Sequence, residues 1–335
     1  MDARRRAFLA TLLATPLLME RRRAVGAAVA RDAAAPPVLQ LLVPAAPGGG
    51  WDGLAQAMAK VLRETGAAAE VGIEHLPGAG GALALPRLVV GMRGRPNTLM
   101  VGGLTLLSSP IVNESALTVL DTIPIARLEA EPLVLTVAAD SPLQTIADFA
   151  RVLQADPLGL RVAGGSEGSA DHILLAMIGQ ALGIDVYALT YLPFGGGGPA
   201  AQAVLDGRAR AGISNWSEFA PHIESGRMRA LALSGEARHP GVEVPTLREG
   251  GIDAVLYNWN GVFAPPGLGE EARTELEVLV DAMVRSAAWQ GEAARRRWQV
   301  LYLPRREFEP FLKAEIRSVR QTLARLGLVQ PRQLP

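Results

Sequence analysis

Short apolar runs alternate along this chain with longer segments whose apolar residues recur at the spacing of an amphipathic helix. The short runs predict nine β-strands, and helical patterns lie between most of them. The predicted strands cover residues 38–44, 70–76, 98–102, 133–139, 160–163, 188–193, 210–214, 228–233 and 256–264. This alternation is typical of α/β folds in which parallel sheets are flanked by helices and ligands bind beyond the carboxyl ends of the strands.

Two apolar runs without turn residues, 133–139 and 228–234, bracket a self-contained αβ segment. We expect the chain to cross between two lobes at these runs. A chain of 335 residues is also long enough for two lobes of ordinary domain size. The sequence therefore predicts a discontinuous lobe one, 36–135 and 235–335, and a lobe two, 136–234.

The first 35 residues have the pattern of an export leader. Three arginines, Arg4 to Arg6, precede an apolar run over residues 7–18, and these are the n-region and h-region of a signal peptide. The segment RRAFL at 5–9 also resembles a twin-arginine signal. Because the apolar run is too short to span a bilayer, we expect residues 1–35 to be removed and the protein to be periplasmic. The export route and the cleavage position stay open.

The composition excludes several classes of function. An apolar content of 49% excludes a disordered chain, and the absence of cysteine excludes disulfides and thiolate metal sites. The four histidines, His75, His172, His222 and His239, are scattered, so no metal site is predicted. Without residues 1–35, the chain keeps 26 of its 33 basic and 30 of its 33 acidic side chains. This slightly acidic balance, with no basic tract, argues against a nucleic-acid partner.

Three consecutive glycines join the first predicted strand to the first predicted helix. We expect that helix to begin at an Asp52 N-cap and to stop at Gly66. Glycines at this junction leave backbone N–H groups uncovered, and a helix N-terminus adds partial positive charge, so the loop suits a carboxylate or phosphate. A tight strand-to-helix turn is the equally simple alternative. The candidate ligand-binding residues of this loop are Gly48, Gly49, Gly50, Trp51 and Asp52.

A second glycine-rich loop follows the predicted strand 70–76. Its spacing fails the dinucleotide fingerprint G-x-G-x-x-G because Leu83 occupies the last glycine position, so no nucleotide is predicted and no cofactor is expected. The loop again presents uncovered amides at a strand end. Its candidate ligand-binding residues are Gly78, Ala79, Gly80 and Gly81.

Three strand ends in lobe two carry further candidates. Ser169 is placed to cap the helix that follows 164–168, and His172 then falls in the first turn of that helix. For Ser169 the alternative is capping alone, and for His172 it is packing. Gly195 and Gly196 lie in another glycine run, and Asn215 ends the strand 210–214, where a turn asparagine is the alternative.

The segment GGSEG at 164–168 also has the G-x-S-x-G spacing of a nucleophile elbow, with Ser166 in the nucleophile position. A secreted serine hydrolase using Ser166 is therefore an alternative function. Such an enzyme needs a histidine partner, but His172 is too close on the same helix, and His222 and His239 lie in polar segments. Because no matched base, nucleophile and acid are present, we expect a binding protein, not an enzyme, with Ser166 among the ligand-binding candidates.

Seven segments, in this order, resemble the motifs of the extracytoplasmic solute receptors of the tripartite tricarboxylate transporter system, also called the Bug family. The resemblance runs from about residue 38 to 325. The segments are PGGGWD (47–52), EHLPGAGG (74–81), GSADH (168–172), LPFGGGGPA (192–200), PHIESGRMRALA (221–232), VPTLREG (244–250) and WNGVFAPPG (259–267). The chain departs from the family pattern at Glu74, where asparagine is usual, and in 192–200, which lacks the family's lysine.

The resemblance implies a two-lobed periplasmic-binding-protein fold of type II-like architecture, with a mostly parallel sheet in each lobe and the ligand cleft between them. It also implies a periplasmic receptor that holds a small di- or tricarboxylate, citrate-like, largely by main-chain amides of the first two loops. Its partners would be the membrane subunits of the transporter, and we expect a monomer. A carboxylate-sensing receptor for a membrane signalling partner is the alternative. Which acid is bound stays open.

Overall fold

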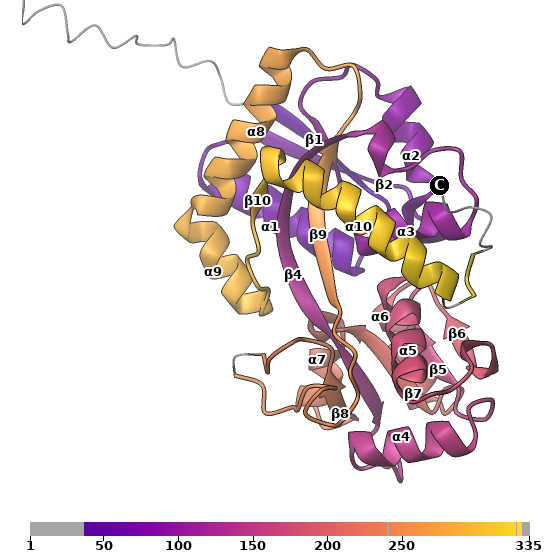
Figure 1. The fold of residues 1–335 in the computed structure, drawn as a ribbon. Coiled ribbons are helices and arrows are strands. Elements are labelled where there is room, and N and C mark those ends of the chain that lie inside the picture. Colours follow the sequence, from indigo (N-terminus) through magenta and orange to yellow (C-terminus); the bar gives the residue numbers. More distant parts are fainter. Residues whose placement is uncertain (1–36, 240, 326, 330–335) are drawn as a thin grey trace, which may run out of the picture. The chain divides into compact units, whose positions relative to one another are not determined.

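One long strand, β4, joins two groups of strands into a continuous sheet in this computed structural model (Figure 1). The structure describes residues 37–239, 241–325 and 327–329, so the predicted leader lies outside the described residues. The strands are β1 (Val38–Val43), β2 (Glu70–His75), β3 (Thr98–Gly103), β4 (Ile123–Ala138), β5 (Val162–Gly164), β6 (Tyr191–Pro193), β7 (Ala211–Asn215), β8 (Met228–Leu233), β9 (Tyr257–Ala264) and β10 (Leu303–Pro304). The strand order is β2-β1-β3-β9-β4-β7-β5-β6, with β8 and β10 also paired to β4.

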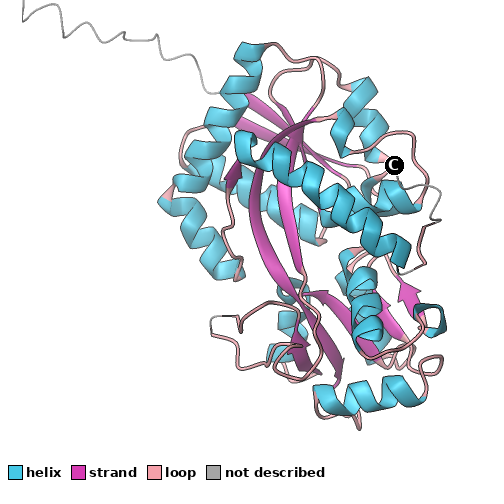
Figure 2. Ribbon diagram, in the orientation of Figure 1, coloured by secondary structure: helices cyan, strands magenta, loops and turns pink. Residues whose placement is uncertain are grey.

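Helices cover both groups of strands (Figure 2). The α-helices are α1 (Gly50–Glu64), α2 (Ala84–Pro86), α3 (Leu104–Val112), α4 (Ile146–Ala155), α5 (Ala170–Ala181), α6 (Gly197–Leu205), α7 (Trp216–Glu224), α8 (Glu270–Arg285), α9 (Ala287–Arg296) and α10 (Arg305–Arg325). Shorter turns of helix are η1 (Ala79–Gly81), η2 (Arg87–Gly91), η3 (Val119–Asp121) and η4 (Val186–Ala188). Among the helices that the structure describes, none has both the length and the apolar character needed to cross a bilayer.

The outer strands of each group are parallel, as the alternation predicts, whereas every pair that includes β4 is antiparallel. In the first group β1 pairs in parallel with β2 and β3, and in the second group β5 pairs in parallel with β6 and β7. The antiparallel partners of β4 are β7, β8, β9 and β10. Parallel strands must be joined by crossovers, which usually contain a helix. The loops that follow parallel neighbours therefore leave from the same edge of each group of strands.

Strand β4 is much longer than the predicted strand 133–139. Residues 133–138 pair with β7 and β8, and residues 123–132 pair with β9. Charged side chains at Arg127, Glu129 and Glu131 interrupt the apolar pattern of the first half, so periodicity alone misses it. The strand therefore continues from one group of strands into the other.

The connection after β8 stays with lobe two before the chain returns. The Leu233 amide donates to the carbonyl of Pro245, and the Leu247 amide donates to the carbonyl of Leu233. Farther along, Ile252 is buried in an apolar cluster that includes Phe149 of α4. We therefore propose that lobe two extends to about residue 256 and that the second crossing lies at the start of β9.

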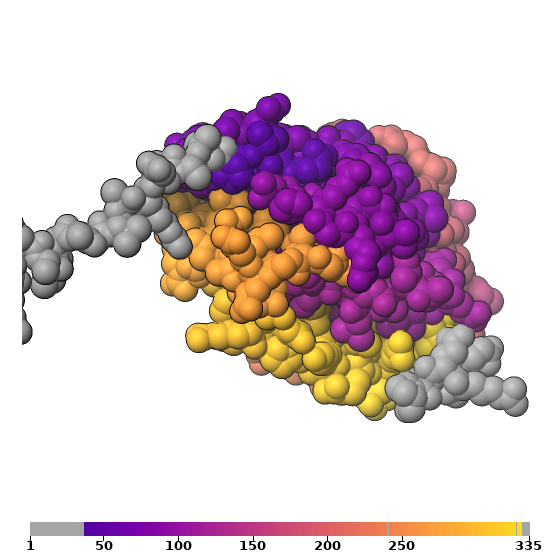
Figure 3. Space-filling view, turned by 90° about the horizontal axis from the view of Figure 1, so that it is seen from above, coloured from indigo at the N-terminus to yellow at the C-terminus, as the bar shows by residue number. Residues whose placement is uncertain are grey.

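Three apolar clusters fill the described part of the molecule, and one of them spans both lobes. One packs β1 and β3 against α1, α8 and α9 through residues such as Leu41, Met58 and Trp289. Another lies under α6 and α7 around Phe219. The largest joins α3, α5 and α10. Figure 3 shows one face of lobe one, where the early chain (indigo and violet) and the late chain (orange and yellow) lie together.

Candidate functional site

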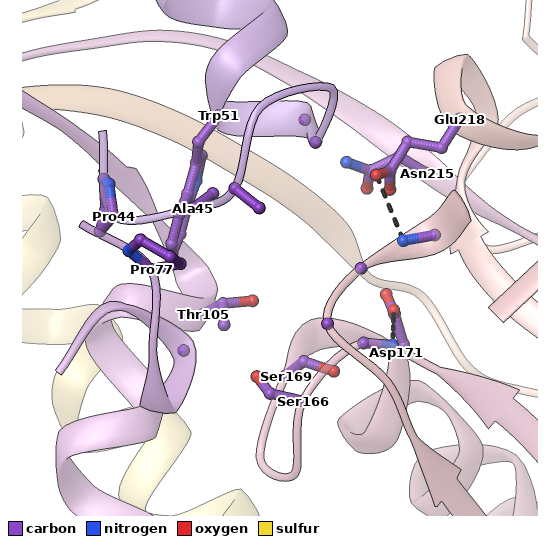
Figure 4. Close-up of a pocket in the computed structure, with 18 of the residues that line it drawn as sticks. Pro44, Ala45, Trp51, Pro77, Thr105, Ser166, Ser169, Asp171, Asn215 and Glu218 are labelled. Carbon is purple, nitrogen blue, oxygen red and sulfur yellow. Dashed lines mark hydrogen bonds between the residues drawn. The ribbon is translucent and has the colours of Figure 1, made fainter. Parts of the chain in front are cut away.

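Strand ends from both lobes surround one cavity of about 380 Å³ (Figure 4). It lies where the loops after β1 and β2 face the loops after β5, β6 and β7. The structure brings eleven of the fifteen predicted residues to its wall. They are Gly49, Gly50, Trp51, Gly78, Ala79, Gly80, Ser166, Ser169, Gly195, Gly196 and Asn215. The other four, Gly48, Asp52, Gly81 and His172, do not line it.

Two of those four residues shape the first loop. Helix α1 begins at Gly50 with Gly49 as its N-cap, because the backbone of Gly49 is extended (φ −80°, ψ 172°), so the predicted Asp52 cap is wrong. Asp52 lies in the first turn, where it accepts a hydrogen bond from the Gly48 amide (2.8 Å) and pairs with His75 Nε2 (2.8 Å). Burial opposes ionisation, but the hydrogen bonds from Gly48 and His75 lower the pKa of Asp52.

Trp51 connects this loop to the strands at the lobe junction. Its indole Nε1 donates to Asn260 Oδ1 (2.8 Å), and Asn260 Nδ2 donates to Glu129 Oε1 (2.7 Å). The cavity wall on the lobe-one side is therefore fixed by a chain of side-chain hydrogen bonds that ends on β4.

The second loop forms a backbone nest. Residues 78–81 all have positive φ, and η1 begins immediately after Gly78. Successive amides in such conformations point into one concavity and suit an anion. A Cβ atom at Gly80 would overlap Ser109, so only glycine fits there. The Gly81 amide donates to the Gly78 carbonyl (2.9 Å), which explains why Gly81 supports the turn and does not line the cavity.

In lobe two, the loop before α5 presents hydroxyls to the cavity. Ser169 is the N-cap of α5 and accepts from the His172 amide (3.4 Å), which confirms the predicted cap. The His172 ring does not face the cavity, since Nδ1 accepts from the Gly168 amide (3.2 Å) and the ring stacks on Tyr191 at 4.2 Å. Burial lowers the pKa of His172 to about 4, so the ring is neutral at pH 7.

The nucleophile-elbow interpretation finds no support in these contacts. Among the described residues, no hydrogen bond joins Ser166 to a histidine, and the ring of His172 is held against Tyr191. A nucleophilic serine needs a base within hydrogen-bond reach. The Ser166 hydroxyl is instead available to a molecule in the cavity, beside the position of Gly80 on the opposite wall.

Two acidic side chains, Asp171 and Glu218, also line the cavity, and the sequence analysis missed both as site residues. Asp171 accepts from the Gly165 amide (2.6 Å), while Glu218 accepts from Ser214 Oγ (2.7 Å) and from the Gly197 amide (3.3 Å). Figure 4 shows both carboxyl groups on the lobe-two side, across the cavity from Trp51. Each lies in the first turn of a helix, where acidic residues are common without any ligand, so their spacing gives no distinguishing signal.

Burial raises the pKa of both acids. For Asp171 the pKa rises to about 7, because burial and the nearby Glu218 outweigh the hydrogen bond from Gly165. For Glu218 burial also raises the pKa, against the hydrogen bonds from Ser214, Gly197 and Gly50. No lysine, arginine or histidine is among the described residues that line the cavity.

The remaining wall consists of residues that the glycine-rich pattern does not mark. Asn258 Nδ2 on β9 donates to Asn215 Oδ1 on β7 (2.9 Å), so these two side chains meet across the lobe junction. Thr105 is the second residue of α3, and its Oγ1 accepts from the Ala170 amide (3.4 Å). The missed residues are Pro44, Ala45, Ala46, Pro77, Thr105, Gly165, Asp171, Gly197, Glu218, Asn258 and Asn260.

The site offers neutral donors. The nest at 78–80, the hydroxyls of Ser166 and Ser169 and the side-chain amide of Asn215 line one space. The first-loop amides are engaged within the protein, since Gly48 donates to Asp52, Gly49 to the Ala46 carbonyl and Gly50 to Glu218. Within the described residues, no cluster of three or more potential metal ligands occurs. An arrangement of this kind can hold an anion through hydrogen bonds from uncharged groups.

Comparison with known proteins gives matches over most of the chain. A model of the tripartite tricarboxylate transporter family receptor matches residues 54–328. Protein BugT of Bordetella pertussis is 28% identical over 278 residues, which cover 79% of this chain and 81% of that protein. MatC from Rhodopseudomonas palustris with bound malate is 25% identical, with a TM-score of 0.75, and covers 86% of this chain and 99% of its own. An R. palustris protein with adipate has a TM-score of 0.79 at 23% identity and covers 87% of this chain and 97% of its own.

These matches confirm the predicted two-lobed periplasmic-binding-protein fold and the resemblance stated from the motifs. The family and the matched structures are solute-binding receptors, so this chain is a receptor and not an enzyme. Family receptors bind small carboxylates and work with membrane transporter subunits. Because the family model covers well over half of its length, the chain belongs to the tripartite tricarboxylate transporter receptor family.

Proposed function

We propose that this protein is a periplasmic receptor that captures a small dicarboxylate between its lobes and delivers it to the membrane subunits of a tripartite tricarboxylate transporter. The observation that carries the proposal is the cavity of about 380 Å³, whose wall combines the backbone nest at 78–80 of lobe one with the hydroxyls of Ser166 and Ser169 of lobe two. Its volume is within the range of about 300–1,000 Å³ typical of small-molecule sites. The leader pattern in residues 1–35 supports export, and we propose that the receptor acts as a monomer.

The charge of the cavity wall favours a ligand with two carboxylates over a ligand with three. Asp171 and Glu218 line the cavity and no cationic side chain among the described residues offsets them, so each further ligand charge adds repulsion. A dicarboxylate can direct one carboxylate to the nest at 78–80 and the other to the hydroxyls of Ser166 and Ser169. The malate and adipate bound to the two matched structures are dicarboxylates, which supports this narrowing. If citrate or another tricarboxylate bound more tightly than the dicarboxylates, this preference for two carboxylates would be wrong.

Hydrogen bonds to charged groups contribute enough affinity for such a receptor. Each is worth roughly 1.5–3 kcal/mol, so a few of them reach the approximately −8 kcal/mol of a micromolar complex after ordering costs. The lobes are expected to close around the solute, as in other hinged binding proteins.

Calorimetric titration against a panel of acids tests the proposal. The panel contains malate, adipate, succinate, citrate, tricarballylate, acetate and neutral glucose as a control. We expect micromolar, one-to-one binding of at least one dicarboxylate and binding at least about tenfold weaker for the tricarboxylates, since an added charge faces Asp171 and Glu218. Tightest binding of citrate would restore the tricarboxylate interpretation, and no heat from any acid would overturn the proposal.

Affinity for the dicarboxylate is expected to rise as the pH falls from 8 to 6. Burial raises the pKa of Asp171 to about 7, so lowering the pH through this value neutralises a carboxylate on the cavity wall. Loss of a repulsion of about 1 kcal/mol corresponds to an increase in affinity of about fivefold. The measurement is titration at several pH values with an acid that is fully ionised throughout.

The matched control for this effect is Asp171→Asn. The asparagine side chain keeps an acceptor for the Gly165 amide but cannot ionise. The affinity of the Asp171→Asn variant for the dicarboxylate should vary less with pH and should equal the low-pH affinity of the natural protein. An unchanged pH slope in the variant, or an affinity that rises with pH in the natural protein, would assign the effect to another group.

A further inference from the structure

Strand β9 separates the solute cavity from a second cavity on its opposite face. Asn258 and Asn260 line the solute cavity, whereas Tyr257 and Trp259 line the second one, which has a volume of about 350 Å³. Successive side chains of a strand point to opposite faces, so one strand serves both cavities. We call the second one the rear cavity. Helix α10 crosses in front of β4 and β9 on this side (Figure 1).

The body of the rear cavity is apolar, and both lobes contribute to it. Ile173 and Met177 project from α5 of lobe two, while Phe311 and Val319 come from α10. Leu104 of α3 adds to the wall, immediately before Thr105 of the solute cavity. These side chains provide a surface for a branched or aromatic apolar group.

Two charged side chains line this cavity without pairing with each other. Arg127 Nε donates to the Leu301 carbonyl (2.8 Å), and its guanidinium lies 4.6 Å from the centre of the Phe311 ring. Within the described part of the chain, no hydrogen bond or ion pair engages the terminal amino groups of Arg127. Glu315 Oε1 accepts from Trp259 Nε1 (3.1 Å). Among the described residues no ion pair joins Glu315 to any cation, and burial raises the pKa of Glu315 against the opposing effects of the Trp259 hydrogen bond and of Arg127. One donor group and one acceptor group therefore line an apolar space.

We propose that the rear cavity is a second ligand site, which binds a free amino acid with an apolar side chain. The carboxylate would lie at the terminal amino groups of Arg127, the ammonium group at Glu315 and the side chain against Ile173 and Met177. A ligand with only one of these charges would displace water from the other half-buried group without offering it a partner, which costs free energy. A zwitterion with an apolar body satisfies all three parts of the wall.

Titration with L-leucine and two truncated analogues tests the proposal. 4-Methylpentanoate lacks the ammonium group and 3-methylbutylamine lacks the carboxylate. We expect leucine to bind and both analogues to bind at least about tenfold more weakly, since each loses one charge-assisted interaction. Absence of leucine binding at millimolar concentration, or equal binding of an analogue, would overturn the proposal.

Variants assign any leucine binding to one of the two cavities. Arg127→Met and Glu315→Gln should each weaken leucine binding at least about tenfold, whereas Gly195→Val, on the wall of the solute cavity, should leave it unchanged. Ser318→Trp is a further variant at an exposed position of the rear-cavity wall, where the added ring should block leucine without disturbing the core. Leucine binding that is lost in Gly195→Val but kept in Ser318→Trp and Arg127→Met would place leucine in the solute cavity and contradict the proposal. Thermal unfolding of each variant checks that the remaining structure is intact, and titration with the dicarboxylate that the natural protein binds adds a second check for Arg127→Met, Glu315→Gln and Ser318→Trp, whose positions do not line the solute cavity.

Discussion

Valine at position 195 is expected to weaken solute capture strongly while the protein stays folded. Gly195 lines the solute cavity, its φ lies outside the left-handed region, and no heavy atom lies within 4 Å of a Cβ atom built there. The two added methyl groups would occupy space that the solute needs and would cover a neighbouring amide. Losing a hydrogen bond to a charged ligand costs roughly 1.5–3 kcal/mol, so affinity should fall at least about tenfold and up to about a hundredfold. Calorimetric titration and thermal unfolding measure the two parts of this prediction.

Gly198→Val is the matched control for that variant. Gly198 lies three residues farther along, also has no heavy atom within 4 Å of a built Cβ atom, and does not line the cavity. The affinity of the Gly198→Val variant for the dicarboxylate should match that of the natural protein. An equal loss of affinity in both variants would show that Gly195 is not part of the binding surface. A substitution at Gly80 is a poorer test, because its overlap with Ser109 would disturb the loop itself.

The free energy of unfolding is expected to fall by several kcal/mol as the pH rises from 5 to 9. Burial raises the pKa of Glu131 on β4 from 4.5 to about 8, against the hydrogen bonds from Ser217. A raised pKa in the folded state means that the stabilisation is complete below 4.5 and is lost as the pH rises through about 8. The shift corresponds to at most about 5 kcal/mol. Urea denaturation at several pH values measures it.

Glu131→Gln isolates this contribution. Glu131 accepts from the Ser217 amide (3.0 Å) and from Ser217 Oγ (2.9 Å), and a glutamine can accept from the amide and donate to the hydroxyl. The variant should be more stable than the natural protein at pH 9, with a shallower dependence on pH. Burial also raises the pKa of Glu129, Asp171 and Glu218, which titrate in the same direction, so part of the slope remains in the variant. If the natural protein were equally stable at pH 5 and pH 9, Glu131 would have to be ionised in the folded state.

The sequence predicts the fold well where local chemistry decides it. The predicted strand 38–44 and β1 nearly coincide, since this run is apolar and ends at a glycine-rich loop. The first half of β4 could not be predicted in this way. Its charged residues are stabilised by distant partners, as Glu131 is by Ser217, and no local pattern reveals such partners.

The residues of the candidate site also divide into those that the local sequence predicts and those that depend on distant parts of the chain. Loops with several glycines at strand ends are visible in the sequence, and the structure brings members of all of them to one cavity. Asp171, Glu218 and Asn258 join that cavity only because distant strands meet there. Asp52 and His172, which the sequence made candidates, form hydrogen bonds within their own lobes instead. Whether a side chain points into a cavity or away from it depends on the tertiary arrangement, which the spacing of residues along the sequence does not determine.

A crystal structure with the dicarboxylate that binds most tightly would show whether the solute is held between the two lobes. We expect the ligand in the solute cavity, with one carboxylate within hydrogen-bond distance of the amides of residues 78–80 and the other near Ser166 and Ser169. The Gly195→Val protein, crystallised under the same conditions, should show no ligand there. A dicarboxylate bound elsewhere, with the solute cavity holding only water, would overturn the proposed function of this cavity.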